Sequence, residues 1–272
     1  MESNYTTKES RKRALGSIPK DKEKYFEDVH FTPLKRPKPG EWLHSAKKES
    51  GQTFAQYKSV APRPLKRTIY LQPLETIPPD LLEFLTNYCE AFFAGMEIRV
   101  LEKVSLTSLK VPFRHNGFKQ YHALKIIQSL RVPRNGHCLL AITMQDLYPR
   151  ESWNFVFGLA KGNKGVFSFA RLGFEGVQEL LWFRAAKTCT HELSHMCGLK
   201  HCIYYLCLMN GSNSLEESSS KPNYLCPVCL KKLHYCIGFN LKTRYDMLAR
   251  VCNKPFELLQ NQMQFYETMA NL

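Results

Sequence analysis

Three histidines and a glycine at fixed spacing constrain this 272-residue chain more than any other feature. The segment reads His191-Glu-x-x-His195-x-x-Gly198-x-x-His201. On a helix, residues four apart rise about 6 Å and project from one face, where two imidazoles can bind one zinc ion. Gly198 permits a left-handed turn that brings His201 back as a third ligand. The spacing therefore predicts a helix that ends beside a three-histidine metal site.

Glu192 gives this site a chemical role. Three protein ligands leave the fourth position of a tetrahedral zinc open, which is typical of catalytic rather than structural zinc. Glu192 directly follows the first histidine, and its carboxylate can reach a water molecule instead of the metal, as a general base must. Chance would give the full motif in only about 3 of 100,000 sequences of this composition, so ordinary polar histidines are the weaker interpretation.

Four cysteines begin at the residue after His201 and predict a second metal site. Cys202-x4-Cys207 and Cys226-x2-Cys229 supply the four thiolates of a closed structural zinc site. Four buried free thiols are the alternative, but such cysteines do not normally come as spaced pairs. The sequence thus predicts two zinc ions per chain, the second of which holds the third histidine rigid. The remaining cysteines are expected to be small apolar core residues: Cys89, Cys138, Cys189, Cys197, Cys236 and Cys252.

Residues 1–66 differ from the rest of the chain in charge and composition. The formal net charge is +14, and the first 67 residues carry 16 of the 38 basic but only 8 of the 24 acidic side chains. With many Pro, Lys and Ser residues and scattered apolar ones, this stretch predicts a flexible basic arm. Arg11, Lys12 and Arg13 form a minimal cluster for nucleic acid or a nuclear import receptor. A solvated tail without a specific charge role is the favoured interpretation.

From residue 67 onward, strand and helix patterns alternate. Strands are expected over 67–74, 97–106, 138–144, 153–159 and 166–171, and helices over 79–95, 118–130 and 175–198. The apolar run 138–144 is typical of a strand covered on both faces. This order predicts an α/β or α+β fold: a mixed twisted sheet, mostly parallel with an antiparallel edge strand, and helices packed on it.

The expected edge strand 153–159 has two possible roles. Trp153, Phe155 and Phe157 share one of its faces, which is favoured as core over substrate pocket. Its main chain could align an extended peptide above the zinc. A further helix is expected over 239–252. The chain then divides into the arm 1–66, a sheet domain 67–201 with the active-site helix, and a zinc-stabilised helical subdomain 202–272.

The histidine motif followed by Met209 resembles metzincins, zinc peptidases with a methionine-containing turn. The continuation His-Cys-x4-Cys-x-Met and then Cys-x-x-Cys resembles archaemetzincins. Segments DLYPRESWNFVFG, VFSFAR, CLMNGSNSLEE and LCPVCLKKL are similar to the animal archaemetzincin-2 type, so the resemblance covers about residues 66–250.

The resemblance implies a metzincin-like fold and a set of roles. His191, His195 and His201 would hold the catalytic zinc, Glu192 would be the general base, and Met209 the Met-turn. Cys202, Cys207, Cys226 and Cys229 would hold the structural zinc. The implied activity is cleavage of peptides, in particular as an aminopeptidase. Ser194 stands where the family usually has glycine, Cys197 where an aromatic residue is common, and segment 172–190 is short. These departures change the walls of the cleft without removing a ligand.

Two other functions remain open. One is a pseudo-peptidase that keeps its zinc but has weak or no activity. The other is a zinc-stabilised binding module whose basic arm contacts nucleic acid or protein, although such a module has no use for an open metal position. The chain shows no run of about 18 apolar residues and no signal-like N-terminus. An intracellular protein, cytoplasmic or nuclear, without a membrane partner is therefore expected.

Overall fold

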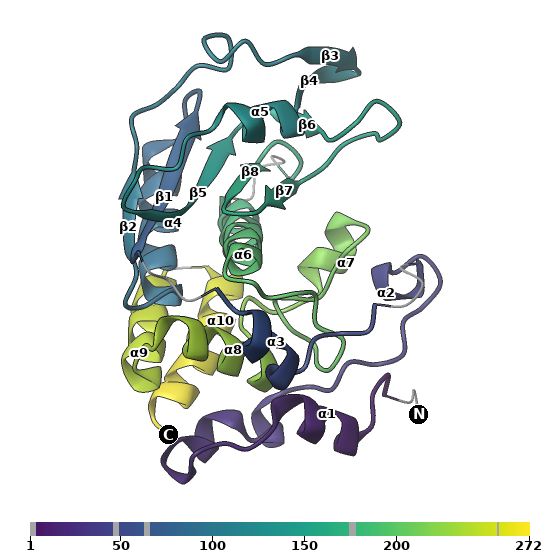
Figure 1. Cartoon of the computed structure of the whole chain (residues 1–272), viewed down its shortest axis with the longest axis vertical. Coiled ribbons are helices and arrows are strands. Elements are labelled where there is room, and N and C mark those ends of the chain that lie inside the picture. Colours follow the sequence, from purple (N-terminus) through teal and green to yellow (C-terminus); the bar gives the residue numbers. More distant parts are fainter. Residues whose placement is uncertain (1–3, 46–48, 63–65, 174–177, 255) are drawn as a thin grey trace.

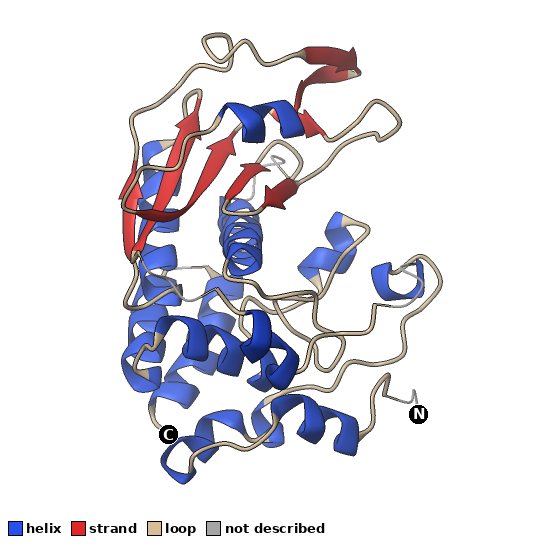
Figure 2. Cartoon of the chain, viewed as in Figure 1, coloured by secondary structure: helices blue, strands red, loops and turns tan. Residues whose placement is uncertain are grey.

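The computed structural model describes residues 4–45, 49–62, 66–173, 178–254 and 256–272. The strands gather in one half of the molecule, and most helices in the other (Figures 1 and 2). Helix α6 (Gln178–Met196) packs against the main sheet and against helices of the other half, so it joins the two. Within these ranges, no helix has both the length and the apolar character needed to cross a membrane.

The main sheet has five strands in the order β2-β1-β5-β8-β7. Four of them are parallel, and β7 pairs antiparallel with β8 at one edge. This arrangement confirms the predicted mixed sheet with an antiparallel edge strand. The strands are β1 (Thr68–Leu74), β2 (Glu97–Val100), β5 (Gly136–Thr143), β7 (Gly158–Lys161) and β8 (Lys164–Ser168).

Strand β5 is buried on both faces, as its apolar run predicts. Cys138 and Leu140 belong to the larger core, which includes α4 (Pro79–Phe92) and α6. Leu139 belongs to a second core with α5 (Ala123–Ser129). Because successive strand residues point to opposite faces, one apolar run supplies both cores.

A second, three-stranded sheet corrects one helix prediction. Residues 118–122 form strand β4 (Phe118–His122), which pairs antiparallel with β3 (Phe113–Asn116) and parallel with β6 (Asp146–Tyr148). The helix expected over 118–130 begins only at residue 123. Gly117, with φ of 73°, closes the β3–β4 hairpin, and this turn favours a strand over the first turn of a helix.

The edge strand also begins later than predicted. Strand β7 starts at Gly158, and Trp153 is 50% exposed, so the expected aromatic core face is wrong there. Arg114 donates hydrogen bonds to the carbonyls of Trp153 and Asn154 at 2.5 and 3.2 Å, and Gln120 donates to Asn154 at 2.8 Å. These side chains occupy main-chain acceptors of the segment that a strand partner would need.

Helices dominate the C-terminal part. Helix α9 (Leu241–Cys252) confirms the helix expected over 239–252 and packs against α4 and α10 (Glu257–Ala270). Helix α8 (Pro227–Ile237) begins immediately after Cys226, and the short α7 (Leu215–Ser219) lies in the preceding loop. The predicted division at residues 201 and 202 stays a prediction.

The N-terminal segment is structured, which differs from the flexible arm expected over 1–66. Tyr25, Phe26, Phe31 and Tyr57 are buried in the larger core. The sequence hid this because the aromatic residues are scattered without periodicity among charged ones. Figure 1 shows the segment running below α8 and then past α7. Its elements are α1 (Lys8–Leu15), the 3₁₀ turns η1 (Lys20–Phe26) and η2 (Asp28–His30), α2 (Trp42–Ser45) and α3 (Phe54–Val60).

Candidate metal centres

Helix α6 carries the first two histidines and ends as its sequence predicts. His191 and His195 lie one turn apart near its C-terminus. Gly198 has φ of 84° and donates its N–H to the carbonyl of His195 at 2.8 Å, so the left-handed turn expected there is present. The expected first residues of this helix, 175–177, lie outside the described residues.

The turn brings His201 back to the first two rings. Its ring centroid lies 5.5 Å from that of His191 and 5.0 Å from that of His195. One ring nitrogen from each histidine lies within 4.8 Å of the other two. The structure therefore gathers all three predicted nitrogen ligands, from a helix and from the loop that follows it.

Each ring is held through Nδ1 by an oxygen acceptor. The pKa of His195 is lowered to about 4, mainly by burial, and burial also lowers that of His191. These two rings are neutral at pH 7, and a neutral ring that donates from Nδ1 has an unprotonated Nε2. The acceptors are Leu208 O for His191 (2.9 Å), Leu199 O for His195 (2.7 Å) and Glu49 Oε1 for His201 (2.8 Å).

This donor set fits a zinc ion. The Nε2 atoms of His191 and His195 are 3.0 Å apart. With both Nδ1 atoms donating elsewhere, neither Nε2 carries a proton, so two lone pairs face each other at that distance. A divalent cation bound by both nitrogens, and by the nearby His201, turns this repulsion into coordination.

Glu192 lies beside the histidines on the same helix, facing strand β7. Burial raises the pKa of its carboxyl group to about 7. A Cβ atom placed on Gly158 would come within 3.1 Å of Glu192 Cγ. Strand β7 can therefore approach the carboxylate closely only because residue 158 is glycine.

A cleft of about 690 Å³ opens at the three histidines. Its walls come from strand β7, helix α6, the turn after α6, the loop around α7, and the N-terminal segment. The lining includes Glu192 and residues from each wall: Trp42, Leu159, Lys187, Leu199 and Leu215. Trp42 and Lys187 were not singled out in the sequence, since neither belongs to a spaced motif.

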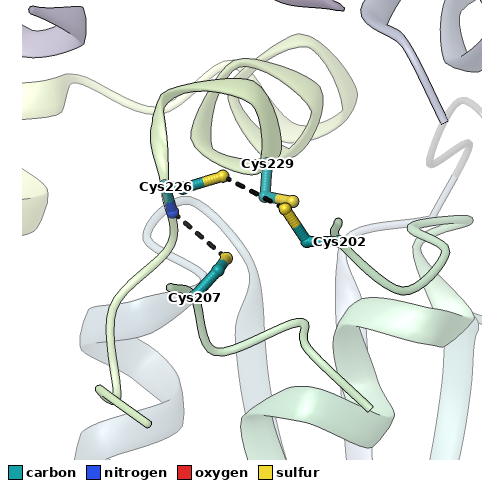
Figure 3. A group of neighbouring side chains, drawn as sticks. All are labelled: Cys202, Cys207, Cys226 and Cys229. Carbon is teal, nitrogen blue, oxygen red and sulfur yellow. Dashed lines mark hydrogen bonds between the residues drawn. The ribbon is translucent and has the colours of Figure 1, made fainter. Parts of the chain in front are cut away.

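The four predicted cysteines also come together. Figure 3 shows their side chains turned toward one another, two from the start of α8 and two from the loop after the third histidine. All four sulfur atoms lie within 4.8 Å of one another, and every one of these residues is buried. The Sγ atoms of Cys202 and Cys226 are 3.6 Å apart.

Hydrogen bonds within the group favour a thiolate at one of the four sulfurs. The backbone N–H of Cys226 donates to Cys207 Sγ at 3.2 Å, and that of Met209 donates to the same sulfur at 3.4 Å. Burial raises the pKa of Cys207 and of Cys226 well above the usual value, whereas hydrogen bonds from the other three cysteines outweigh burial at Cys202 and hold its pKa well below the usual range. A buried thiolate needs a cation nearby, so this set also fits a zinc ion.

Met209 and Asn210 order the loop that carries the first two cysteines. Met209 is buried, and its carbonyl accepts from the N–H of Cys202 at 2.8 Å; its role as Met-turn stays a prediction. Asn210, which the sequence analysis missed, donates to the carbonyls of Cys202 and Tyr205 at 2.7 and 3.0 Å. Its side-chain oxygen accepts from the N–H of Cys207 at 2.8 Å, so one side chain binds three backbone groups of the loop that carries Cys202 and Cys207.

The family departures lie inside the fold. Ser194 is fully buried, and in the described part of the chain its Oγ has no hydrogen-bond partner. Cys197 is buried in the larger core, in the packing role expected of it, and the other five unpaired cysteines are buried too. Part of segment 172–190, residues 174–177, lies outside the described residues.

Comparisons with known proteins agree with this geometry. Residues 91–235 match Peptidase family M54. Archaemetzincin-2 of Rattus norvegicus is 38% identical over 267 residues, which cover 81% of this chain and 74% of the relative; that of Homo sapiens is 36% identical with the same coverage.

The fold shows the same relationship. The crystal structure of archaemetzincin from Archaeoglobus fulgidus matches with a TM-score of 0.52 and 33% identity, over 61% of this chain and 99% of that chain. That from Methanopyrus kandleri also has a TM-score of 0.52, with 27% identity, over 66% of this chain and 100% of that one. Fold and site thus define a zinc metallopeptidase. The chain belongs to the archaemetzincins, Peptidase family M54.

Proposed function

We propose that this protein hydrolyses peptide bonds in small peptides, with aminopeptidase action as the favoured form. One observation carries the proposal: three imidazole nitrogens converge beside a partly buried carboxylate in an open cleft. Membership of a zinc metallopeptidase family supports the reaction class. The preference for an aminopeptidase rests on the family resemblance.

His191, His195 and His201 would hold the catalytic zinc, which when bound supplies a Lewis acid for the scissile carbonyl and lowers the pKa of water. Glu192 would accept a proton from the attacking water and return it to the leaving amine. Both transfers need a carboxylate at the cleft wall, which is where Glu192 lies.

Strand β7 is the proposed guide for the substrate. It pairs with β8 along one edge, and Gly158, Leu159 and Ala160 line the cleft along the other side. An extended peptide could add to this edge through main-chain hydrogen bonds. The sequence predicted this role for a strand over 153–159, and the proposal now assigns it to the shorter strand β7.

The four cysteines would hold a structural zinc that fixes the loop carrying the third histidine, with Met209 as the Met-turn. A nucleic-acid role is the weaker alternative, since a binding module has no use for an open metal position with a glutamate beside it. The intracellular location stays a prediction of the sequence.

Glu192→Gln tests the mechanism. The amide cannot accept the proton of the water, so hydrolysis of a peptide library should fall by roughly 100- to 10,000-fold while both zinc ions stay bound. Peptides with free and with acetylated N-termini in the same library test the aminopeptidase preference. Glu216→Gln is the matched control, because Glu216 is exposed on α7, outside the cleft lining.

Two outcomes would count against the proposal. Wild-type turnover in Glu192→Gln would remove this residue from the mechanism. A wild-type protein that holds two zinc ions and cleaves no peptide would favour the pseudo-peptidase alternative.

A further inference from the structure

The N-terminal segment reaches the turn that carries the third histidine. Gln52 bridges this turn, because its amide donates to the carbonyl of Gly198 at 3.3 Å and its oxygen accepts from the N–H of Lys200 at 3.2 Å. Tyr57 donates its hydroxyl to the carbonyl of Cys197 at 2.8 Å. Gln52 and Tyr57 therefore pack on the backbone between His195 and His201, although about 140 to 150 positions separate the two parts of the sequence.

Glu49 contacts the imidazole ring of His201 itself rather than the backbone of the turn. Its Oε1 atom lies 2.8 Å from Nδ1 of His201, and its Oε2 atom accepts from the indole N–H of Trp42 at 3.0 Å. The Trp42 ring stands edge-on to the His201 ring, with centroids 5.3 Å apart. Both carboxylate oxygens are thus engaged, and the carboxylate has one defined orientation toward the imidazole.

The three histidines differ in what fixes them. His191 and His195 project from a regular helix, and each donates from Nδ1 to a backbone carbonyl. His201 lies on a loop, and the acceptor at its Nδ1 is a side-chain carboxylate from a distant segment. The ring with the least support from its own backbone is therefore the one held by a charged group.

We propose that Glu49 is a positioning residue for the metal site: it fixes the ring and tautomer of His201 and so completes the zinc site from the N-terminal segment. A carboxylate that accepts from Nδ1 leaves Nε2 free for the metal and makes it more basic. The proposal rests on the three-histidine zinc site of the proposed function, but not on peptide hydrolysis.

The hydrogen bonds of Glu49 agree with this role. Both of its oxygens meet donors, one from His201 and one from Trp42, which is the pattern that an acceptor-only carboxylate makes.

The test is zinc affinity of the full-length protein, measured without substrate by competition with a chromophoric chelator. Removing such a carboxylate partner typically weakens metal binding 10- to 100-fold. Glu49→Ala should therefore weaken zinc binding at the histidine centre, which is the more labile of the two zinc ions, by about that factor. Glu49→Gln keeps the acceptor oxygen but loses the charge, and an intermediate loss is expected. The more tightly held zinc should be unaffected in both variants.

A control in the same segment separates positioning from simple packing. Gln52→Ala removes hydrogen bonds to the same turn without touching a ring, so it should lower the unfolding temperature and change zinc affinity less than about 2-fold. Glu49→Gln should keep the wild-type unfolding temperature while its zinc affinity falls.

Either of two results would overturn the proposal: wild-type zinc affinity in Glu49→Ala, or equal losses of affinity in Glu49→Ala and Gln52→Ala. If instead the proposed function is wrong, the wild-type protein will bind zinc at the histidine centre normally and cleave no peptide. Zinc affinity and peptide hydrolysis therefore distinguish the two failures.

Discussion

The two candidate metal centres adjoin in sequence at His201 and Cys202, yet they lie in opposite environments. The four cysteines are at most 4% exposed and belong to the larger core. The three histidines are partly buried and line a cleft of about 690 Å³. The cysteine set would enclose an ion with protein, whereas the histidine set would leave one side of an ion open to a ligand, which is the general difference between structural and catalytic zinc.

The two centres also differ in how much of each exists before a metal binds. Helix α6 places His191 and His195 on one face by its own hydrogen bonds. The cysteines come from two chain segments joined by the polar loop 208–225, and a metal ion is the cross-link that the sequence offers between them. Loss of the cysteine metal should therefore damage the fold, whereas loss of the histidine metal should damage activity.

Cys229→Ser is expected to have the largest effect on stability. It removes one ligand of the closed site, so the free energy of unfolding should fall by at least about 4 kcal/mol, or no folded protein should be recovered. Zinc analysis and urea unfolding are the measurements. Cys236→Ser is the control on the same helix α8, since Cys236 donates to the carbonyl of Pro62 and serine can do the same. A Cys229→Ser protein with two zinc ions and wild-type stability would place that cysteine outside the site.

Brief treatment with a chelator should have a smaller effect on stability. The histidine centre opens to the cleft, so its zinc should leave first, and one zinc ion per chain should remain. Peptide hydrolysis should be lost, and zinc addition should restore it. The free energy of unfolding should fall by less than in Cys229→Ser. If both ions leave together with the fold, the contrast between the two centres is wrong.

Short-range patterns made much of this site predictable. The spacing of His191, His195, Gly198 and His201 encodes a helix and its left-handed end, because both depend on residues within one or two turns. The paired cysteines and the apolar run of β5 are equally local. The mostly parallel sheet followed from the order of such segments.

Long-range contacts account for what the sequence did not predict. Glu49 meets His201 across 152 positions, and no spacing rule connects the two. The late start of β7 depends on Arg114 and Gln120, which come from strands β3 and β4 of another sheet. The N-terminal segment was predicted to be flexible from its charge, but a few buried aromatic residues, such as Tyr57, hold it in the core.

Lys187 shows an electrostatic feature of the open centre. It lies on α6 at the wall of the cleft and is buried, and its Nζ donates to the carbonyl of Ser218 at 2.7 Å and to that of Lys221. Burial, with a smaller contribution from the charge of Lys221, lowers its pKa from 10.5 to about 7. Lys187 therefore attaches the loop around α7 to helix α6 at the cost of burying a cation.

This burial predicts the smallest effect, a dependence of stability on pH. Below pH 7 the ammonium is protonated in both states, and between pH 7 and about 10 the folded protein releases the proton while the unfolded chain keeps it. Stability should thus rise with pH, by about 1.4 kcal/mol between pH 6 and pH 8 from this group. Urea unfolding at both pH values should show that the change in stability from pH 6 to pH 8 is more positive by this increment in the wild type than in Lys187→Met, since Glu192 and the other groups titrate alike in both proteins.

Lys242→Met is the matched control, because this lysine is exposed on α9 beside Asp246 and should leave the wild-type pH dependence unchanged. Comparing slopes rather than absolute stabilities cancels the hydrogen bonds that Lys187→Met also removes, since their loss acts at both pH values. Parallel slopes in the wild type and Lys187→Met would mean that the cleft wall carries no such electrostatic cost. The histidine centre would then differ from the cysteine centre in its access to solvent, and the burial of Lys187 beside it would carry no cost in stability.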